Sequence, residues 1–133
     1  MRANAIPALL AVVALCAVAA SAAAESLSCG TAQANIALYN KGRLGYTSAT
    51  LDVRSGKRQV TRRFEFVWLN AACLTNPAGR PFLVYQAYCG GPRCSDEHDW
   101  GIIEPASLKV LLEPSAGNRK KAEAIFGGPL DPL

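Results

Sequence analysis

The sequence predicts a β-rich α+β domain: an antiparallel meander of about six strands with one short C-terminal helix, stapled by disulfides. Three observations lead to this class. Short segments with alternating or β-branched apolar residues follow one another, turn-forming residues separate them, and helical spacing is evident only near the end of the chain. Cysteines distributed along a short chain add covalent links to the predicted core.

The first 24 residues resemble a leader rather than part of the fold. Met1 and Arg2 precede an apolar run over residues 6–20, and Ser21 to Ala24 are small residues of the kind at which signal peptidase cleaves. This layout predicts a secretory signal peptide, removed after Ala24, and hence a location in the bacterial periplasm or outside the cell. A transmembrane anchor is the alternative, but a spanning helix needs about 20 apolar residues.

Cleavage there leaves residues 25–133, a length suited to a single small globular domain. The leader carries one of the 14 lysines and arginines, so 13 remain against 10 acidic residues. This mild positive charge is typical of an ordinary soluble protein. No transmembrane segment is expected in the mature chain.

Four cysteines remain after Cys16 leaves with the leader, and an even number in a small exported domain predicts disulfides. The short spacing between Cys89 and Cys94 favours a bridge that closes a turn, which pairs Cys29 with Cys73. A crossed pairing stays open, because spacing does not fix connectivity.

The first half of the mature chain predicts three strands after a polar lead-in at residues 25–31. Residues 33–39 alternate, although several helix formers make a helix the competing interpretation. Residues 44–53 are rich in β-formers, and a turn at residues 54–57 joins them to residues 60–69 in a hairpin. In that last segment Phe64, Phe66 and Trp68 are predicted to share the buried face.

The second half predicts three more strands and the helix. Asn76, Pro77 and Gly79 signal a turn before residues 82–88, which are apolar on both faces as in a central strand. Residues 100–103 and 108–112 are short strands. Asn118 is the expected N-cap of a helix over Arg119–Phe126 that ends at Gly127 and docks on the sheet, and the last residues are expected to fray.

The loop from Cys89 to Cys94 is the first candidate binding site. Its Gly-Gly-Pro-Arg interior turns tightly, and a closing disulfide would hold Arg93 outward beside Gly91 and Pro92. A stabilised hairpin end with no further role is the alternative. The spacing lacks the Cys-x-x-Cys arrangement of redox enzymes.

The C-x4-C spacing of this loop resembles that of the active-site loop in bacterial periplasmic inhibitors of vertebrate lysozyme. The resemblance covers six residues, and that family places a histidine inside the loop, whereas His98 lies beyond it here. It implies an inhibitor or immunity protein that plugs a cell-wall hydrolase.

Asp96, Glu97, His98 and Asp99 follow the loop and include the only histidine. A divalent-metal site using Asp96, His98 and Asp99 is one interpretation and a solvated acidic turn is the other, since metal ligands usually converge from several segments. His98 is also a contact residue whose charge changes near neutral pH.

Residues 54–63 form a basic stretch without an acidic residue, in which Arg58, Arg62 and Arg63 are the candidate second contact surface. Export excludes nucleic acid and leaves a protein or an anionic envelope component as the partner. A solvated hairpin is the alternative.

No complete set of nucleophile, base and oxyanion stabiliser is evident, and no nucleotide-binding motif is present. The sequence therefore predicts an exported, non-catalytic binding protein without a cofactor.

Overall fold

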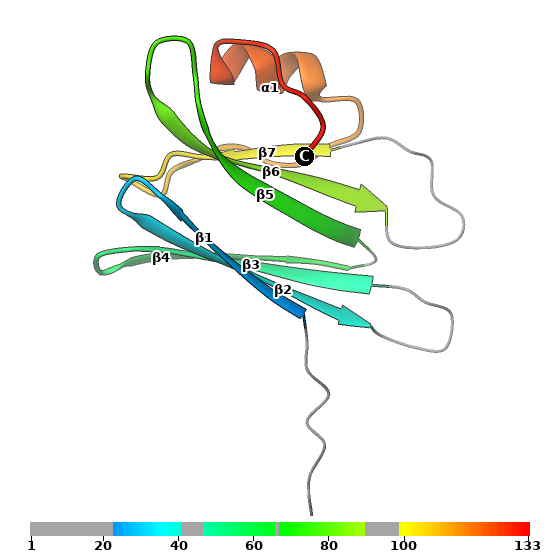
Figure 1. Ribbon diagram of the computed structural model, residues 1–133. Coiled ribbons are helices and arrows are strands. Elements are labelled where there is room, and N and C mark those ends of the chain that lie inside the picture. Colours follow the sequence, from blue (N-terminus) through cyan, green and yellow to red (C-terminus); the bar gives the residue numbers. More distant parts are fainter. Residues whose placement is uncertain (1–22, 41–46, 66, 90–98) are drawn as a thin grey trace, which may run out of the picture.

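The computed structural model describes residues 23–40, 47–65, 67–89 and 99–133. These residues form eight strands in two antiparallel sheets and one short helix. Figure 1 shows three layers: the first sheet, the second sheet and the helix. The prediction of a β-rich antiparallel meander with one C-terminal helix is confirmed, but the prediction of one sheet of about six strands is wrong.

The first sheet, sheet A, contains strands β1 to β4 in sequence order. Their bounds are β1 Ala23–Cys29, β2 Ala32–Asn40, β3 Thr47–Ser55 and β4 Arg58–Phe64. The predicted hairpin of β3 and β4 is confirmed, and its turn contains Gly56 with a positive φ of 58°. The left-handed conformation costs glycine least, so the turn occurs where the sequence places this residue.

The polar lead-in predicted for residues 25–31 is wrong, because most of it belongs to β1. Leu27 and Cys29 are the only large apolar residues of that stretch, too few to reveal the alternation that pairing with β2 stabilises. β1 also includes Ala23 and Ala24, which pair with Leu38 and Ala37. Cleavage after Ala24 would therefore shorten β1 by two residues.

The second sheet, sheet B, contains strands β5 to β8, again in sequence order. Their bounds are β5 Val67–Thr75, β6 Pro81–Cys89, β7 Asp99–Ile103 and β8 Val110–Leu112. β6 is central and buried on both faces, as predicted. The expected single strand over residues 60–69 is divided between β4 and β5, which lie in different sheets.

This division reverses the face on which one aromatic residue lies. Phe64 packs against the core between the sheets, whereas Trp68 is 49% exposed on the outer face of sheet B. Phe64 and Trp68 are four residues apart, so in one continuous strand both would point to the predicted buried face. The chain changes sheets between them, and in β5 it is Val67 and Leu69 that face the core. Phe66 lies outside the described residues.

Two apolar clusters hold the layers together. The first lies between the sheets and includes Ile36, Leu51, Leu83 and Tyr85. Gly101 leaves the space that the Tyr85 ring fills, since an added Cβ would lie 2.0 Å from its Cζ. The second cluster lies between sheet B and the helix; its buried members are Phe82, Val84, Trp100, Ile102, Leu112, Ala122, Phe126 and Leu130.

Helix α1, Arg119–Phe126, has the predicted bounds and docks on sheet B as expected. Asn118 precedes it but makes no side-chain cap hydrogen bond. Its amide instead accepts a hydrogen bond from the Trp100 N–H (2.9 Å) and donates to the Trp100 carbonyl (2.8 Å). Asn118 therefore joins the start of the helix to β7, because both groups of its amide find partners there.

The last residues are not frayed, contrary to expectation. The Leu130 side chain is buried with the helix cluster, and the Leu133 N–H donates to Gln86 Oε1 at 2.8 Å. Packing and hydrogen bonding on the outer face of sheet B thus hold this segment. Within the described part of the chain, no helix is long and apolar enough to cross a membrane.

The predicted Cys29–Cys73 disulfide is confirmed. It joins β1 to β5, which are edge strands of different sheets, and so links the two layers covalently. The predicted bridge between Cys89 and Cys94 lies outside the described residues and stays a prediction.

Candidate functional site

The outer face of sheet A is polar on all four strands and no described segment covers it (Figure 1). Strand alternation directs one set of side chains away from the core, and the antiparallel register aligns them in rows across the sheet. This set, which we call the polar face, consists of Ser26, Ser28, Gln33, Asn35, Thr50, Asp52, Arg54, Gln59, Thr61 and Arg63.

Asp52 is the centre of a hydrogen-bond network on the polar face. Its carboxylate accepts hydrogen bonds from Gln59 (2.6 Å), Thr61 (2.9 Å) and Arg54 (3.0 Å). Burial raises the pKa of Asp52, but the three hydrogen bonds and the Arg54 charge together outweigh it and hold this pKa below its usual value. The network fixes neighbouring side chains on β3 and β4.

The β1–β2 half of the face has its own side-chain pairs. Ser26 donates to Asn35 Oδ1, and Gln33 donates to the Ser28 hydroxyl at 2.7 Å. These contacts cross between paired strands, so the face presents oriented amide and hydroxyl groups. Such groups can bind a polar partner with little further ordering of side chains.

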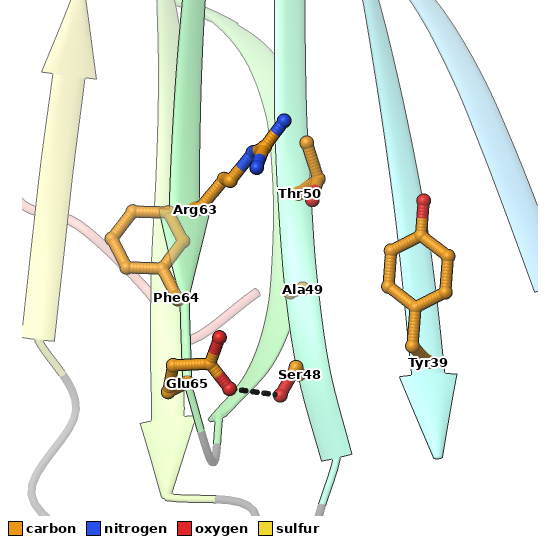
Figure 2. Close-up of a pocket in the computed structure, with 7 residues that line it drawn as sticks. All are labelled: Tyr39, Ser48, Ala49, Thr50, Arg63, Phe64 and Glu65. Carbon is orange, nitrogen blue, oxygen red and sulfur yellow. Dashed lines mark hydrogen bonds between the residues drawn. The ribbon is translucent and has the colours of Figure 1, made fainter. Parts of the chain in front are cut away.

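A pocket of about 350 Å³ lies at one end of this face (Figure 2). Seven residues from β2, β3, β4 and the position after β4 line it: Tyr39, Ser48, Ala49, Thr50, Arg63, Phe64 and Glu65. Ser48 donates to Glu65 Oε2 at 2.9 Å. In Figure 2 the Arg63 guanidinium extends towards Thr50, while the Glu65 carboxylate lies beside Ser48.

The register explains why these residues meet. Tyr39 pairs with Ser48, and Thr50 pairs with Arg63, so β3 carries its two hydroxyls between the phenol of β2 and the charge of β4. Tyr39 is 43% exposed, whereas most of the described aromatic residues are buried or half-buried. The pocket therefore combines an accessible ring, hydroxyl groups and one charge of each sign.

The three arginines predicted as a second surface do not share one face. Arg62 points to the core side of β4 and forms an ion pair with Glu113 at 2.8 Å, and Arg58 donates to the Ser107 carbonyl at 3.3 Å. Only Arg63 lies on the polar face. Alternation along a strand separates neighbouring residues, so a basic cluster in the sequence becomes two surfaces in the fold.

The buried side of Arg62 lies near Tyr85. Burial raises the pKa of Tyr85 far above its usual value, and the Glu113 charge raises it further, while the Arg62 charge opposes both effects. Tyr85 therefore stays neutral near physiological pH, and it serves as a core residue.

The predicted contact residues Gly91, Pro92, Arg93 and His98 lie outside the described residues. The strands on either side are paired as far as Ala87 and Asp99, so the intervening segment joins two central strands of sheet B. Figure 1 shows that β6 and β2 end at the same end of the molecule. Tyr39, near the end of β2, lines the pocket.

The metal alternative is not tested by the structure. Asp96 and His98 are outside the described residues, and Asp99 begins β7 in a half-buried position. Among the residues that the structure does describe, no three histidine, cysteine or acidic side chains gather as a metal site would require.

Comparison with models of known protein families, with curated proteins and with solved structures finds no significant match. The interpretation of the polar face therefore depends on its own geometry. Sequence reasoning identified only Arg63 among the pocket residues. The signal it could have used is the succession of Ser48, Thr50 and Asp52 on one face of a strand whose other face is apolar.

Proposed function

We propose that this protein is a non-catalytic binding protein of the bacterial periplasm or cell exterior, and that the polar face of sheet A is its contact surface. The observation that carries the proposal is the difference between the two outer faces. Sheet B buries most of its outer face under α1 and the last residues, whereas no described segment covers the polar face. A protein or an anionic envelope component is the partner we propose.

The proposed location has two supports. The first 24 residues have the layout of a signal peptide. The Cys29–Cys73 disulfide agrees with an oxidising compartment, since such bonds persist mainly in exported proteins.

The experiment compares charge substitutions on opposite surfaces of the molecule. Asn35 lies in the middle of the polar face, and Ala124 is exposed on α1. We expect Asn35→Glu to weaken co-sedimentation with purified cell walls, or cross-linking to a partner in periplasmic extract. Ala124→Glu should leave both unchanged. The proposal is wrong if Asn35→Glu binds as well as the parent does.

A second candidate is an inhibitor of a cell-wall hydrolase that acts through the loop from Cys89 to Cys94, and the pairing of the flanking strands β6 and β7 favours it. β6 and β7 are both central strands, so the segment between them starts from a firmly held frame. Inhibition assays with lysozymes and other wall hydrolases test this candidate. If Arg93→Ala inhibits as well as the parent, the loop does not act as a plug.

A further inference from the structure

We propose that the pocket lined by Tyr39, Ser48, Thr50, Arg63 and Glu65 binds a carboxylated sugar unit of an envelope glycan. This inference rests on the proposed binding role and assigns a ligand class to one part of the polar face. The pocket volume of about 350 Å³ is sufficient for one sugar ring.

Arg63 selects for a carboxylate. It is exposed, lines the pocket, and has no ion pair or hydrogen bond among the described residues, in contrast to Arg54, Arg62 and Arg80. A guanidinium presents parallel N–H donors whose spacing matches the two oxygens of a carboxylate. Arg63 therefore supplies a charged contact at the Thr50 end of the pocket.

The other polar side chains of the pocket can form hydrogen bonds with the hydroxyl groups of a sugar. Thr50 contributes a hydroxyl that can donate and accept, and the Ser48 hydroxyl, which donates to Glu65, retains its acceptor capacity. The Glu65 carboxylate accepts from Ser48 and so fixes the orientation of this hydroxyl. Sugar hydroxyls both donate and accept, so a sugar ring matches this set better than a simple anion does.

Tyr39 supplies the apolar surface. The residue is 43% exposed, and its ring lies across β3 from Arg63, on the strand next to Ser48. An aromatic side chain with an accessible ring and a polar tip offers an apolar platform for the C–H face of a sugar together with one hydrogen bond. A carboxylated sugar is the ligand that uses the ring, the hydroxyls and the cation together.

Two matched pairs of probes test the ligand class on the purified protein by NMR titration of backbone amides. Glucuronate and glucose differ in the carboxylate on the ring, and N-acetylmuramic acid and N-acetylglucosamine differ in the ether-linked carboxylate. We expect the acid of at least one pair to bind about tenfold more tightly than its neutral counterpart, at dissociation constants of about 1 mM. The preferred pair identifies where the carboxylate is attached.

Variants assign the effect to the pocket. Arg63→Gln should remove the tenfold preference for the acid and leave the neutral sugar unchanged, and Tyr39→Ala should weaken both. Arg80→Gln is the matched control, because Arg80 is an exposed arginine that lies outside both the pocket and the polar face and pairs with Glu104. Thermal unfolding of each variant verifies that it is folded.

Two results would overturn the inference. One is equal affinity for the acid and neutral member of both pairs, including no binding of any of the four sugars. The other is an equal loss of acid binding in Arg80→Gln and Arg63→Gln. If either occurs while Asn35→Glu still weakens capture of a partner, the ligand class is wrong and the proposed function stands. If Asn35→Glu has no effect either, both fail.

Discussion

The two sheets have the same connectivity but opposite outer faces. Each is a four-stranded meander, and each contributes one face to the core between them. Sheet B places Phe82, Val84, Trp100 and Ile102 on its outer face, where α1 and the last residues cover them. Sheet A places serine, threonine, amide and charged side chains there. The comparison teaches that the outer face of sheet B is used mainly for packing, whereas no described segment covers the outer face of sheet A.

The largest expected effect on stability comes from one of the two tryptophans on the outer face of sheet B. Trp100 is 1% exposed under the helix, and Trp68 is 49% exposed beyond it. Trp100→Ala should lower the free energy of unfolding by about 3–5 kcal/mol through lost burial and a cavity. Trp68→Ala should change it by about 0.5 kcal/mol or less. Urea denaturation measures both changes in the free energy of unfolding. Equal changes would contradict the conclusion that α1 covers Trp100 but not Trp68.

Removal of the disulfide between the sheets is expected to cause the next largest loss of stability. Cys29 and Cys73 are 44 residues apart, and loss of a bridge that closes such a loop is expected to cost about 3–4 kcal/mol. Cys73→Ala isolates the bridge, because the Cys73 residue is itself exposed and contributes little burial. A denaturation midpoint unchanged by Cys73→Ala would show that the sheets are not held together by this bond.

Asn118 tests how the helix is attached to sheet B. Asn118→Ala should cost about 1–3 kcal/mol, because it leaves the buried N–H and carbonyl of Trp100 without their partner. Aspartate is as good an N-cap as asparagine, but it has no N–H to donate to the Trp100 carbonyl. Asn118→Asp should therefore fail to restore stability in a thermal melt. Full recovery would instead assign Asn118 an ordinary capping role.

Asp52 tests the order of the polar face and gives the smallest effect. Since the folded-state pKa of Asp52 is lowered, its contribution is complete at neutral pH and is lost as the pH falls below about 4. Asp52→Asn should lower stability at pH 7 by less than about 1 kcal/mol, because the site is partly solvated. The difference in melting temperature from the parent should narrow as the pH is lowered from 6 to 3. A gap that widens on acidification would contradict the network.

Much of the local structure could be predicted from residue order. The turns at Gly56 and at Asn76 to Gly79, the helix Arg119–Phe126 and the bridge between Cys29 and Cys73 all follow from turn chemistry, helical spacing and cysteine pairing. β1 could not be predicted, because it takes its stability from pairing with β2 rather than from its own composition.

The candidate site could be predicted only in part from the sequence. Arg63 belongs to a basic stretch and was identified from it, but Tyr39, Ser48, Thr50 and Glu65 show no motif in the sequence. They come together because the register of β2, β3 and β4 aligns them, and register depends on contacts between segments rather than within them.

The sequence by itself determined that this chain is β-rich, where most of its strands turn, and where its helix begins and ends, because these properties depend on residues close together in the chain. Only the tertiary structure decided that the strands divide into two sheets between Phe64 and Val67. It also decided that one outer face is mostly buried and that the described segments leave the other uncovered. The physical reason is that alternation gives a side chain one of two faces, and the packing of distant segments determines which of those faces meets the core.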